Sequence, residues 1–176
     1  MAALPEERFP SRAGRVFLRE RAFLERPLTM RGVTETDLPE LVRVDQEAFP
    51  EEPYPYFVLR QLYDIHGDRM LVLDDGERLH GYVLFPVAPD GQGWIMSLGV
   101  TRDQRGRGLG RRLMLEVLRR LRAEGVREVR LTVEPANAAA IMLYRSIGFV
   151  SEDEVRKGYF GPEEDRLVMT LSLRRG

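Results

Sequence analysis

A glycine-rich turn between an apolar segment and an amphipathic segment constrains this chain more than any other feature. The apolar residues 94–100 precede the turn, and apolar residues recur at helical spacing over 109–122 after it. The turn reads Gln104-Arg-Gly-Arg-Gly-Leu-Gly110. Glycines allow backbone angles that a Cβ forbids, so N–H groups at a helix N-terminus can point at phosphate oxygens. Strand, turn and helix in this order predict a site for a phosphate-bearing cofactor. Four arginines surround the turn, at positions 105, 107, 111 and 112.

Two known phosphate-binding motifs fit the turn poorly. A P-loop ends in Lys-Ser or Lys-Thr, whereas this turn continues into Arg111-Arg112-Leu113. A dinucleotide fingerprint has the spacing Gly-x-Gly-x-x-Gly, whereas the glycines here stand at 106, 108 and 110. The remaining pattern, Arg105-x-x-Gly108-x-Gly110, resembles the coenzyme A pyrophosphate loop of the GCN5-related N-acetyltransferases (GNAT).

A second segment strengthens this resemblance. Residues 131–149 read Leu-Thr-Val-Glu-Pro-Ala-Asn, a helical segment, and then Tyr144 followed by Gly148-Phe149. They are similar to the second signature of the same family, and the likeness runs from about residue 30 to about residue 173. Within the family, the chain is most similar to the N-terminal amino acetyltransferases, including those that act on ribosomal proteins. Phe49-Pro50, residues 95–99 and residues 158–160 carry that finer likeness.

Length and periodicity predict one domain of the α/β (α+β) class. A chain of 176 residues with 43% hydrophobic content can bury one core, and we assign residues 27–176 to a single N-acetyltransferase domain. We assign residues 1–26 to an N-terminal extension, which could cover the cleft, mediate a homodimer or remain mobile. We expect strands at 28–33, 69–74, 79–87, 94–100, 128–133, 152–156 and 166–173, and helices at 38–48, 56–66, 109–122 and 138–147.

These elements predict a mixed, mostly antiparallel central sheet with helices on both faces. The resemblance implies the GNAT fold, in which a parallel strand pair splays apart and the pantetheine arm enters the gap.

Composition argues against several other functions. A net charge of −1 and a pI near 6.2 do not suggest a nucleic-acid partner. The absence of cysteine excludes disulfides, thiolate zinc sites and a cysteine nucleophile, and the isolated His66 and His80 suggest no metal site. No apolar run approaches the roughly 20 residues of a membrane span. We therefore expect a cytoplasmic protein without membrane contact.

The resemblance implies that acetyl-CoA is the acyl-donor cosubstrate. Main-chain groups of Leu98 and Val100 would pair with the pantetheine arm, and backbone donors of the turn would carry most of the pyrophosphate binding. Asn137 would bind the pantetheine amides, although it could also be only a helix cap. Tyr144 would give a proton to the leaving thiolate, the alternative being that it only packs in the core. The implied cofactor-binding residues are Leu98, Gly99, Val100, Arg105, Gly106, Arg107, Gly108, Leu109, Gly110, Arg111, Asn137 and Tyr144, with Tyr144 catalytic.

The base that would take the amine proton is not apparent. Related enzymes often place a Glu, His or Tyr at positions that Thr132 and Trp94 occupy here, and neither residue can act as a base. Ordered water, a backbone carbonyl or simple loss to solvent would be enough to remove the proton of an α-amine, whose pKa is about 7.7–8.0. Removal of the proton from a lysine side chain, whose pKa is about 10.4, would be harder. Substrate contacts are expected from Phe49, Glu51, Tyr54 and Tyr159.

The sequence therefore favours an acetyl-CoA-dependent N-acetyltransferase that acts by direct attack of a primary amine. A protein N-terminus is the first choice of acceptor. The alternatives are a small amine, such as a polyamine, an amino acid or an aminoglycoside, and a non-catalytic coenzyme A-binding module.

Overall fold

A computed structural model of the chain describes residues 26–152 and 154–173. The predicted N-terminal extension therefore lies outside the described residues except for Arg26. The helices are α1 (Leu38–Ala48), α2 (Tyr56–His66), α3 (Leu109–Ala123) and α4 (Ala138–Ile147), with short 3-10 turns at Glu35–Asp37, Gly67–Arg69 and Arg102–Gln104. The strands are β1 (Thr29–Gly32), β2 (Met70–Asp74), β3 (Leu79–Leu84), β4 (Gly93–Ile95), β5 (Ser97–Val100), β6 (Glu128–Val133), β7 (Val150–Ser151) and β8 (Leu167–Ser172).

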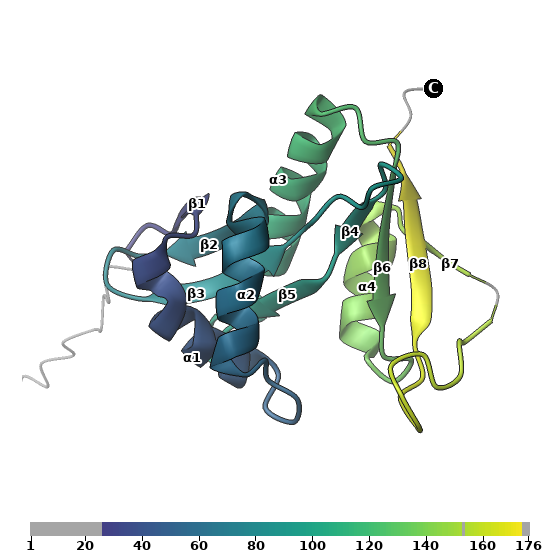
Figure 1. Cartoon of the computed structure of the whole chain (residues 1–176), viewed down its shortest axis with the longest axis horizontal. Helices are drawn as coiled ribbons and strands as arrows, with labels where there is room; N and C mark the ends of the chain where they lie inside the picture. The colour runs from purple at the N-terminus through teal and green to yellow at the C-terminus, as the bar shows by residue number, and fades with distance from the viewer. Residues whose placement is uncertain (1–25, 153, 174–176) are drawn as a thin grey trace, which may run out of the picture.

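The strands form two separate four-stranded sheets, which are the two halves of the strand layer (Figure 1). The first half has the order β1-β2-β3-β5, and all of its pairs are antiparallel. The second has the order β4-β6-β8-β7, in which β4 and β6 are parallel and the other pairs antiparallel. This arrangement confirms the predicted α/β class and the mostly antiparallel sheet.

The predicted continuous strand 94–100 is wrong, because Met96 interrupts it. Ile95 is the last β4 residue paired with β6, and Ser97 is the first β5 residue paired with β3. The N–H of Met96 donates to the carbonyl of Leu84, which is also the β3 partner of Ser97. Two residues therefore oppose one, which is the geometry of a β-bulge and turns the strand at this point. As a result β5 pairs with β3, β6 pairs with β4 and β8, and β5 and β6 are not partners of each other.

Helices cover both faces of the first half-sheet, as the sequence predicts. Along β2, Leu71 and Leu73 face the core under α3 and α4, whereas Met70 and Val72 face the core under α1 and α2. Adjacent strand residues point to opposite faces, so an uninterrupted apolar strand requires a cover on each side. On α3 the buried residues recur at helical spacing and include Leu109, Leu113, Val117 and Leu121. Burial of each such leucine contributes roughly 1.5–3 kcal/mol to folding.

The strand predicted at 152–156 is also wrong. β7 ends at Ser151, and only a single bridge between Arg156 and Arg166 follows. The guanidinium of Arg156 lies 2.7 Å from the carboxylate of Glu152, whereas residues four apart in a strand are separated by about 13 Å. Gly158 and Gly161 then take positive φ angles of 59° and 142°. Residues 154–166 therefore form a loop between β7 and β8, called below the 154–166 loop.

Candidate active site

The glycine-rich turn offers unbonded N–H donors at the start of α3. Gly106 and Gly108 have φ angles of 75° and 76°, in the left-handed region that favours glycine. The first helical bond runs from the N–H of Arg112 to the carbonyl of Gly108. Within the described chain, the N–H groups of Gly108, Leu109 and Gly110 donate to no backbone or capping side-chain acceptor. An exposed helix N-terminus of this kind fits an anionic pyrophosphate.

The arginine side chains around this turn hold it to neighbouring elements. Arg105 donates to the carbonyl of Ala48 at the end of α1 (3.1 Å) and to that of Val100 at the end of β5 (3.3 Å). Arg111 donates to the hydroxyl of Ser146 on α4 at 2.8 Å. The sequence predicts that the backbone donors of the turn carry most of the pyrophosphate binding, with the arginines around them. The contacts of Arg105 and Arg111 are to carbonyl and hydroxyl oxygens, so they do not occupy those backbone N–H donors.

The edge of β5 that faces away from β3 offers further main-chain groups. The N–H of Thr101 donates to the carbonyl of His80, so in this antiparallel register Gly99 and Ser97 bond to β3 while Leu98 and Val100 face the opposite side. On this edge the carbonyl of Val100 accepts a hydrogen bond from Arg105. This edge fits the strand-like pairing that the resemblance implies for the pantetheine arm.

Gly99 and Gly110 allow close packing around this edge. A Cβ on Gly99 would lie 3.0 Å from both the Cβ of Ala48 and the ring of Tyr82. A Cβ on Gly110 would lie 3.4 Å from Leu143 of α4 and 3.9 Å from Leu98 of β5. The start of α3, the edge of β5 and α4 therefore meet at one place.

Helix α4 contributes the two predicted residues Asn137 and Tyr144. The Oδ1 of Asn137 accepts the N–H of Ala140 at 3.1 Å, so Asn137 is the N-cap of α4. Tyr144 is 8% exposed and its ring packs against Phe149, with centroids 5.9 Å apart. Its hydroxyl bonds to no group of the described residues. Burial raises the pKa of Tyr144 to about 12, so the phenol stays protonated and can act as a hydrogen-bond donor.

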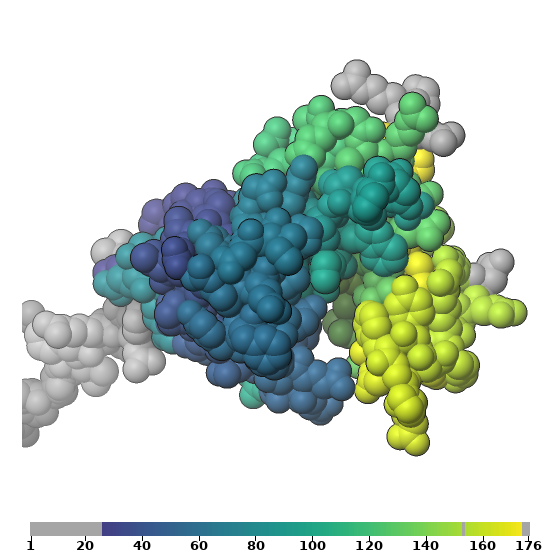
Figure 2. Space-filling model, in the orientation of Figure 1, coloured from purple at the N-terminus to yellow at the C-terminus, as the bar shows by residue number. Residues whose placement is uncertain are grey.

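Residues 49–55 and the 154–166 loop face each other on one side of the molecule. Figure 2 shows a hollow between the 49–55 segment and the 154–166 loop. Arg166 joins the two, because its guanidinium lies 4.0 Å from the carboxylate of Glu52 and 4.8 Å from the ring centre of Phe160. The predicted substrate residues Phe49, Glu51 and Tyr54 belong to the first wall, and Tyr159 belongs to the second.

Sequence reasoning missed a buried polar cluster behind the 49–55 segment. The hydroxyl of Tyr82 on β3 donates to the carboxylate of Asp45 on α1 and also contacts the hydroxyl of Ser97 on β5. The available signal was helical spacing, since Asp45 stands four and seven residues after the apolar Leu41 and Leu38. That position places a carboxylate on the buried face of α1, where it requires partners.

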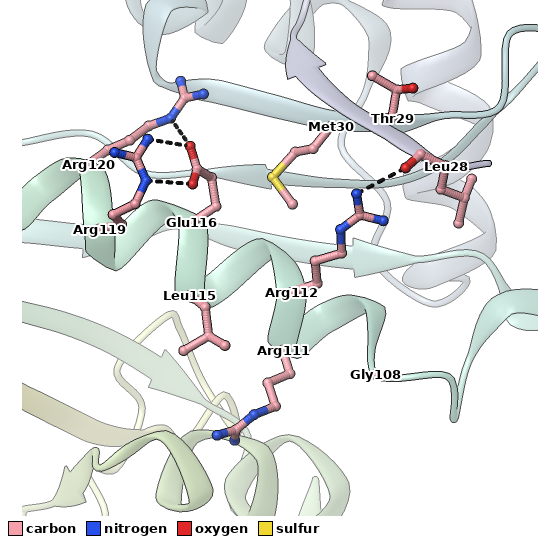
Figure 3. A pocket seen from close by; sticks show the side chains of 10 residues that line it. All are labelled: Leu28, Thr29, Met30, Gly108, Arg111, Arg112, Leu115, Glu116, Arg119 and Arg120. Carbon is pink, nitrogen blue, oxygen red and sulfur yellow. Dashed lines mark hydrogen bonds and ion pairs between the residues drawn. The ribbon is translucent and has the colours of Figure 1, made fainter.

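A groove lies on the other side of the turn, between β1 and α3 (Figure 3). Its volume is about 840 Å³, but the arginines that line it already have partners. Arg119 and Arg120 bond to Glu116, and Arg112 donates to the carbonyl of Leu28 (Figure 3). The implied acyl site at β5 and α4 does not lie in this groove.

Two features of the described residues bear on other functions. Residues 26–152 and 154–173 hold no group of three or more His, Cys, Asp or Glu side chains placed to bind a metal ion. None of the helices in this part of the chain is long and apolar enough to cross a membrane.

A comparison with protein families identifies the chain. A model described as the acetyltransferase (GNAT) family matches residues 36–149, which hold the turn, β5 and α4. The chain belongs to this family. The acetyltransferase therefore transfers an acetyl group from acetyl-CoA to an amine, and structures with bound acetyl-CoA are among those that share its fold.

Two relatives and one solved structure indicate where the acetyltransferase stands in the family. It is 31% identical over 152 residues to the [ribosomal protein bS18]-alanine N-acetyltransferase of Salmonella typhimurium, covering 82% of the chain and 97% of the relative. It is 35% identical over 153 residues to the mycothiol acetyltransferase of Saccharopolyspora erythraea, covering 81% of the chain but only 50% of that relative. The chain thus spans about half the length of the second relative. The crystal structure of the ribosomal-protein-S18-alanine N-acetyltransferase from Escherichia coli aligns with a TM-score of 0.74 and 26% identity, covering 85% of the chain and 96% of that structure.

Proposed function

We propose that the acetyltransferase acetylates the α-amine of a protein N-terminus. The observation that carries the proposal is the hollow between the 49–55 segment and the 154–166 loop, since a peptide requires access from an open side of the molecule (Figure 2). Phe49 and Tyr159 are 36% and 37% exposed at these two walls, and Phe160 is 61% exposed. Exposed aromatic rings provide rigid contact surface for a peptide chain.

The relatives support the same acceptor class. The chain aligns with 97% of the length of an enzyme named [ribosomal protein bS18]-alanine N-acetyltransferase. The identity to a mycothiol acetyltransferase favours a small amine as the second candidate, although that match covers half of the relative. Because the family is one of acetyltransferases, we do not propose the non-catalytic coenzyme A-binding module.

Each part of the site has a proposed role in this reaction. When bound, acetyl-CoA supplies the acetyl group as a thioester. The backbone donors of Gly108, Leu109 and Gly110 would hold the pyrophosphate, and the outer edge of β5 would hold the pantetheine arm in register. The hydroxyl of Tyr144 has no protein partner in the described chain and would donate to the thiolate sulfur.

The test is a comparison of acceptors by release of free thiol from acetyl-CoA. One peptide begins with a free alanine amine and contains one internal lysine. Its matched control has the same sequence with a blocked N-terminus. A panel of polyamines, amino acids and aminoglycosides completes the set. Acetylation of the free N-terminal peptide in preference to the blocked peptide and the small amines is expected. Preference for a small amine would overturn the proposal in favour of the second candidate.

A further inference from the structure

Three hydroxyl and carboxyl groups form a continuous hydrogen-bonded chain through the protein interior. Asp45 and Tyr82 are fully buried, and Ser97 is 8% exposed. The hydroxyl of Tyr82 lies 2.5 Å from Asp45 Oδ1 and 2.6 Å from Ser97 Oγ. The N–H of Tyr54 donates to the other carboxylate oxygen of Asp45 at 2.6 Å.

The chemistry of these groups fixes the direction of the bonds. An ionised carboxylate only accepts hydrogen bonds, so Tyr82 must donate its proton to Asp45. The oxygen of Tyr82 then accepts from the hydroxyl of Ser97, whose own lone pairs have no further donor among the described residues. One end of this hydrogen-bonded chain is therefore Ser97 Oγ, which can accept a hydrogen bond. The other end is the carboxylate of Asp45, which can take a proton.

The position of Ser97 places this acceptor beside the proposed site of reaction. Ser97 directly follows the bulge at Met96, where pairing with β6 has ended and the exposed edge of β5 begins. Its side chain faces α1, on the same side of the sheet as Ala48 and Phe49, which contact the position of Gly99. The start of α3 lies toward the opposite face. An amine that enters from the 49–55 segment would thus meet Ser97 before it meets the thioester.

We propose that Ser97, Tyr82 and Asp45 form a relay that removes the proton of the acceptor ammonium. The N–H bond of the ammonium breaks as Ser97 Oγ gains that proton, the Ser97 hydroxyl proton passes to Tyr82, and the Tyr82 proton passes to Asp45. The amine becomes neutral and nucleophilic, and Asp45 becomes a carboxylic acid. The proton returns to solvent by the reverse route after the product leaves. Ser97 is the catalytic residue of this relay, and Tyr82 and Asp45 act through it.

The surroundings of Asp45 favour this direction of transfer. Burial raises the pKa of Asp45 above its ordinary value, against the opposing effect of the bonds from Tyr82 and the Tyr54 N–H. The titratable groups that face it are Tyr82 from β3 and Tyr54 from the segment before α2, while β5 contributes the uncharged Ser97. Asp45 forms no ion pair within residues 26–152 and 154–173, so a proton on it neutralises a buried charge.

The inference rests on the proposed function for its acceptor, and the test uses the full chain with the peptide that carries a free N-terminal alanine. The variants are Ser97→Ala and Tyr82→Phe, and kcat/KM for the peptide is measured from pH 6 to pH 9. Tyr63→Phe is the matched control, because it removes a phenol from α2 that packs against the same core but lies outside the relay. Substitution of Asp45 would also release the Tyr54 amide, so the two hydroxyl variants are cleaner.

The relay makes a specific prediction about pH. Without it, only the neutral amine reacts, and an α-amine with a pKa of about 8 is roughly one tenth neutral at pH 7 and one hundredth at pH 6. Both variants should therefore lose about tenfold in kcat/KM at pH 7 and about a hundredfold at pH 6, and should approach the unmodified enzyme near pH 9. The control should follow the unmodified enzyme within about twofold throughout.

The outcomes separate this inference from the function on which it depends. A loss that is the same factor at every pH would show a structural role for the cluster and overturn the relay, as would no loss at all. If the unmodified enzyme does not acetylate the peptide, the proposed function is overturned. The relay is then overturned for that acceptor as well.

Discussion

Replacing Gly108 with alanine should weaken acetyl-CoA binding without any steric clash. Gly108 has a φ of 76°, and a Cβ built there would have no atom within 4 Å. The substitution therefore adds only the conformational cost of a left-handed residue with a Cβ, roughly 1–2 kcal/mol. Because Gly108 is exposed at the first turn of α3, we expect the variant backbone to relax in the unliganded protein. Binding must then restore the strained conformation, which corresponds to a roughly 5–30-fold higher Kd.

Gly125, at the opposite end of the same helix, provides the matched control. Its φ is 83°, and a Cβ there would also have no neighbour within 4 Å. The bonds from the Gly125 N–H to Arg122 and from the Val126 N–H to Leu121 hold its conformation. Gly125→Ala should therefore lower the melting temperature by roughly 2–8 °C while it leaves the Kd within about twofold.

Isothermal titration calorimetry with acetyl-CoA and thermal melts of both variants would make the comparison. Equal affinities in Gly108→Ala and Gly125→Ala would refute the reasoning, because the turn would then be an ordinary helix start with no role in holding the pyrophosphate.

Two further predictions concern a hydroxyl group and a carboxylate. Tyr144→Phe should lower kcat by about a hundredfold or more and leave the Kd for acetyl-CoA within about twofold, because the hydroxyl has no partner in the described chain. Steady-state kinetics would measure kcat, and calorimetry would measure the Kd. An unchanged kcat would remove Tyr144 from its role as proton donor. Arg31, bonded to both carboxylate oxygens of Asp37, lowers the pKa of that carboxyl from 3.8 to about 2. A carboxyl group whose pKa is lower in the folded than in the unfolded protein stabilises the fold at pH values above its unfolded pKa. That stabilisation is lost as the pH falls through the folded pKa. Asp37→Asn should thus lower the free energy of unfolding by roughly 1–2 kcal/mol at pH 6, as measured by urea titration. The difference between the variant and the unmodified protein should disappear between pH 4 and pH 2. A difference that does not depend on pH would contradict the ion pair of Arg31 and Asp37 as its cause.

The elements with strong local signals were predictable from the sequence. α2 spans Tyr56–His66 and β6 spans Glu128–Val133, as expected. Pro55 marks the start of α2, and the turn at Gly125 comes shortly before β6. β3 ends at Leu84, three residues earlier than expected, since Pro86 cannot donate to a ladder.

The bulge and the relay could not be predicted in the same way. Residues 94–100 are apolar on both faces of a strand, so alternation gives no sign of an extra residue at Met96. The bonds of Tyr82 reach Asp45 across 37 residues and Ser97 across 15, and only the folded sheet brings them together. The turn and Tyr144 were found through short motifs, and their roles stay predictions.

The bulge at Met96 also determines which changes in chain length the protein can tolerate. Ile95 before it and Leu98 after it both pack toward α3, although they are three residues apart, while Ser97 points the other way. A deletion of one residue here would restore strict alternation and turn Leu98 and Val100 toward α1, with Ser97 and Gly99 moved to the α3 side. Loss of a single codon at this position should thus be more damaging than most substitutions of Met96, whose own side chain is 46% exposed.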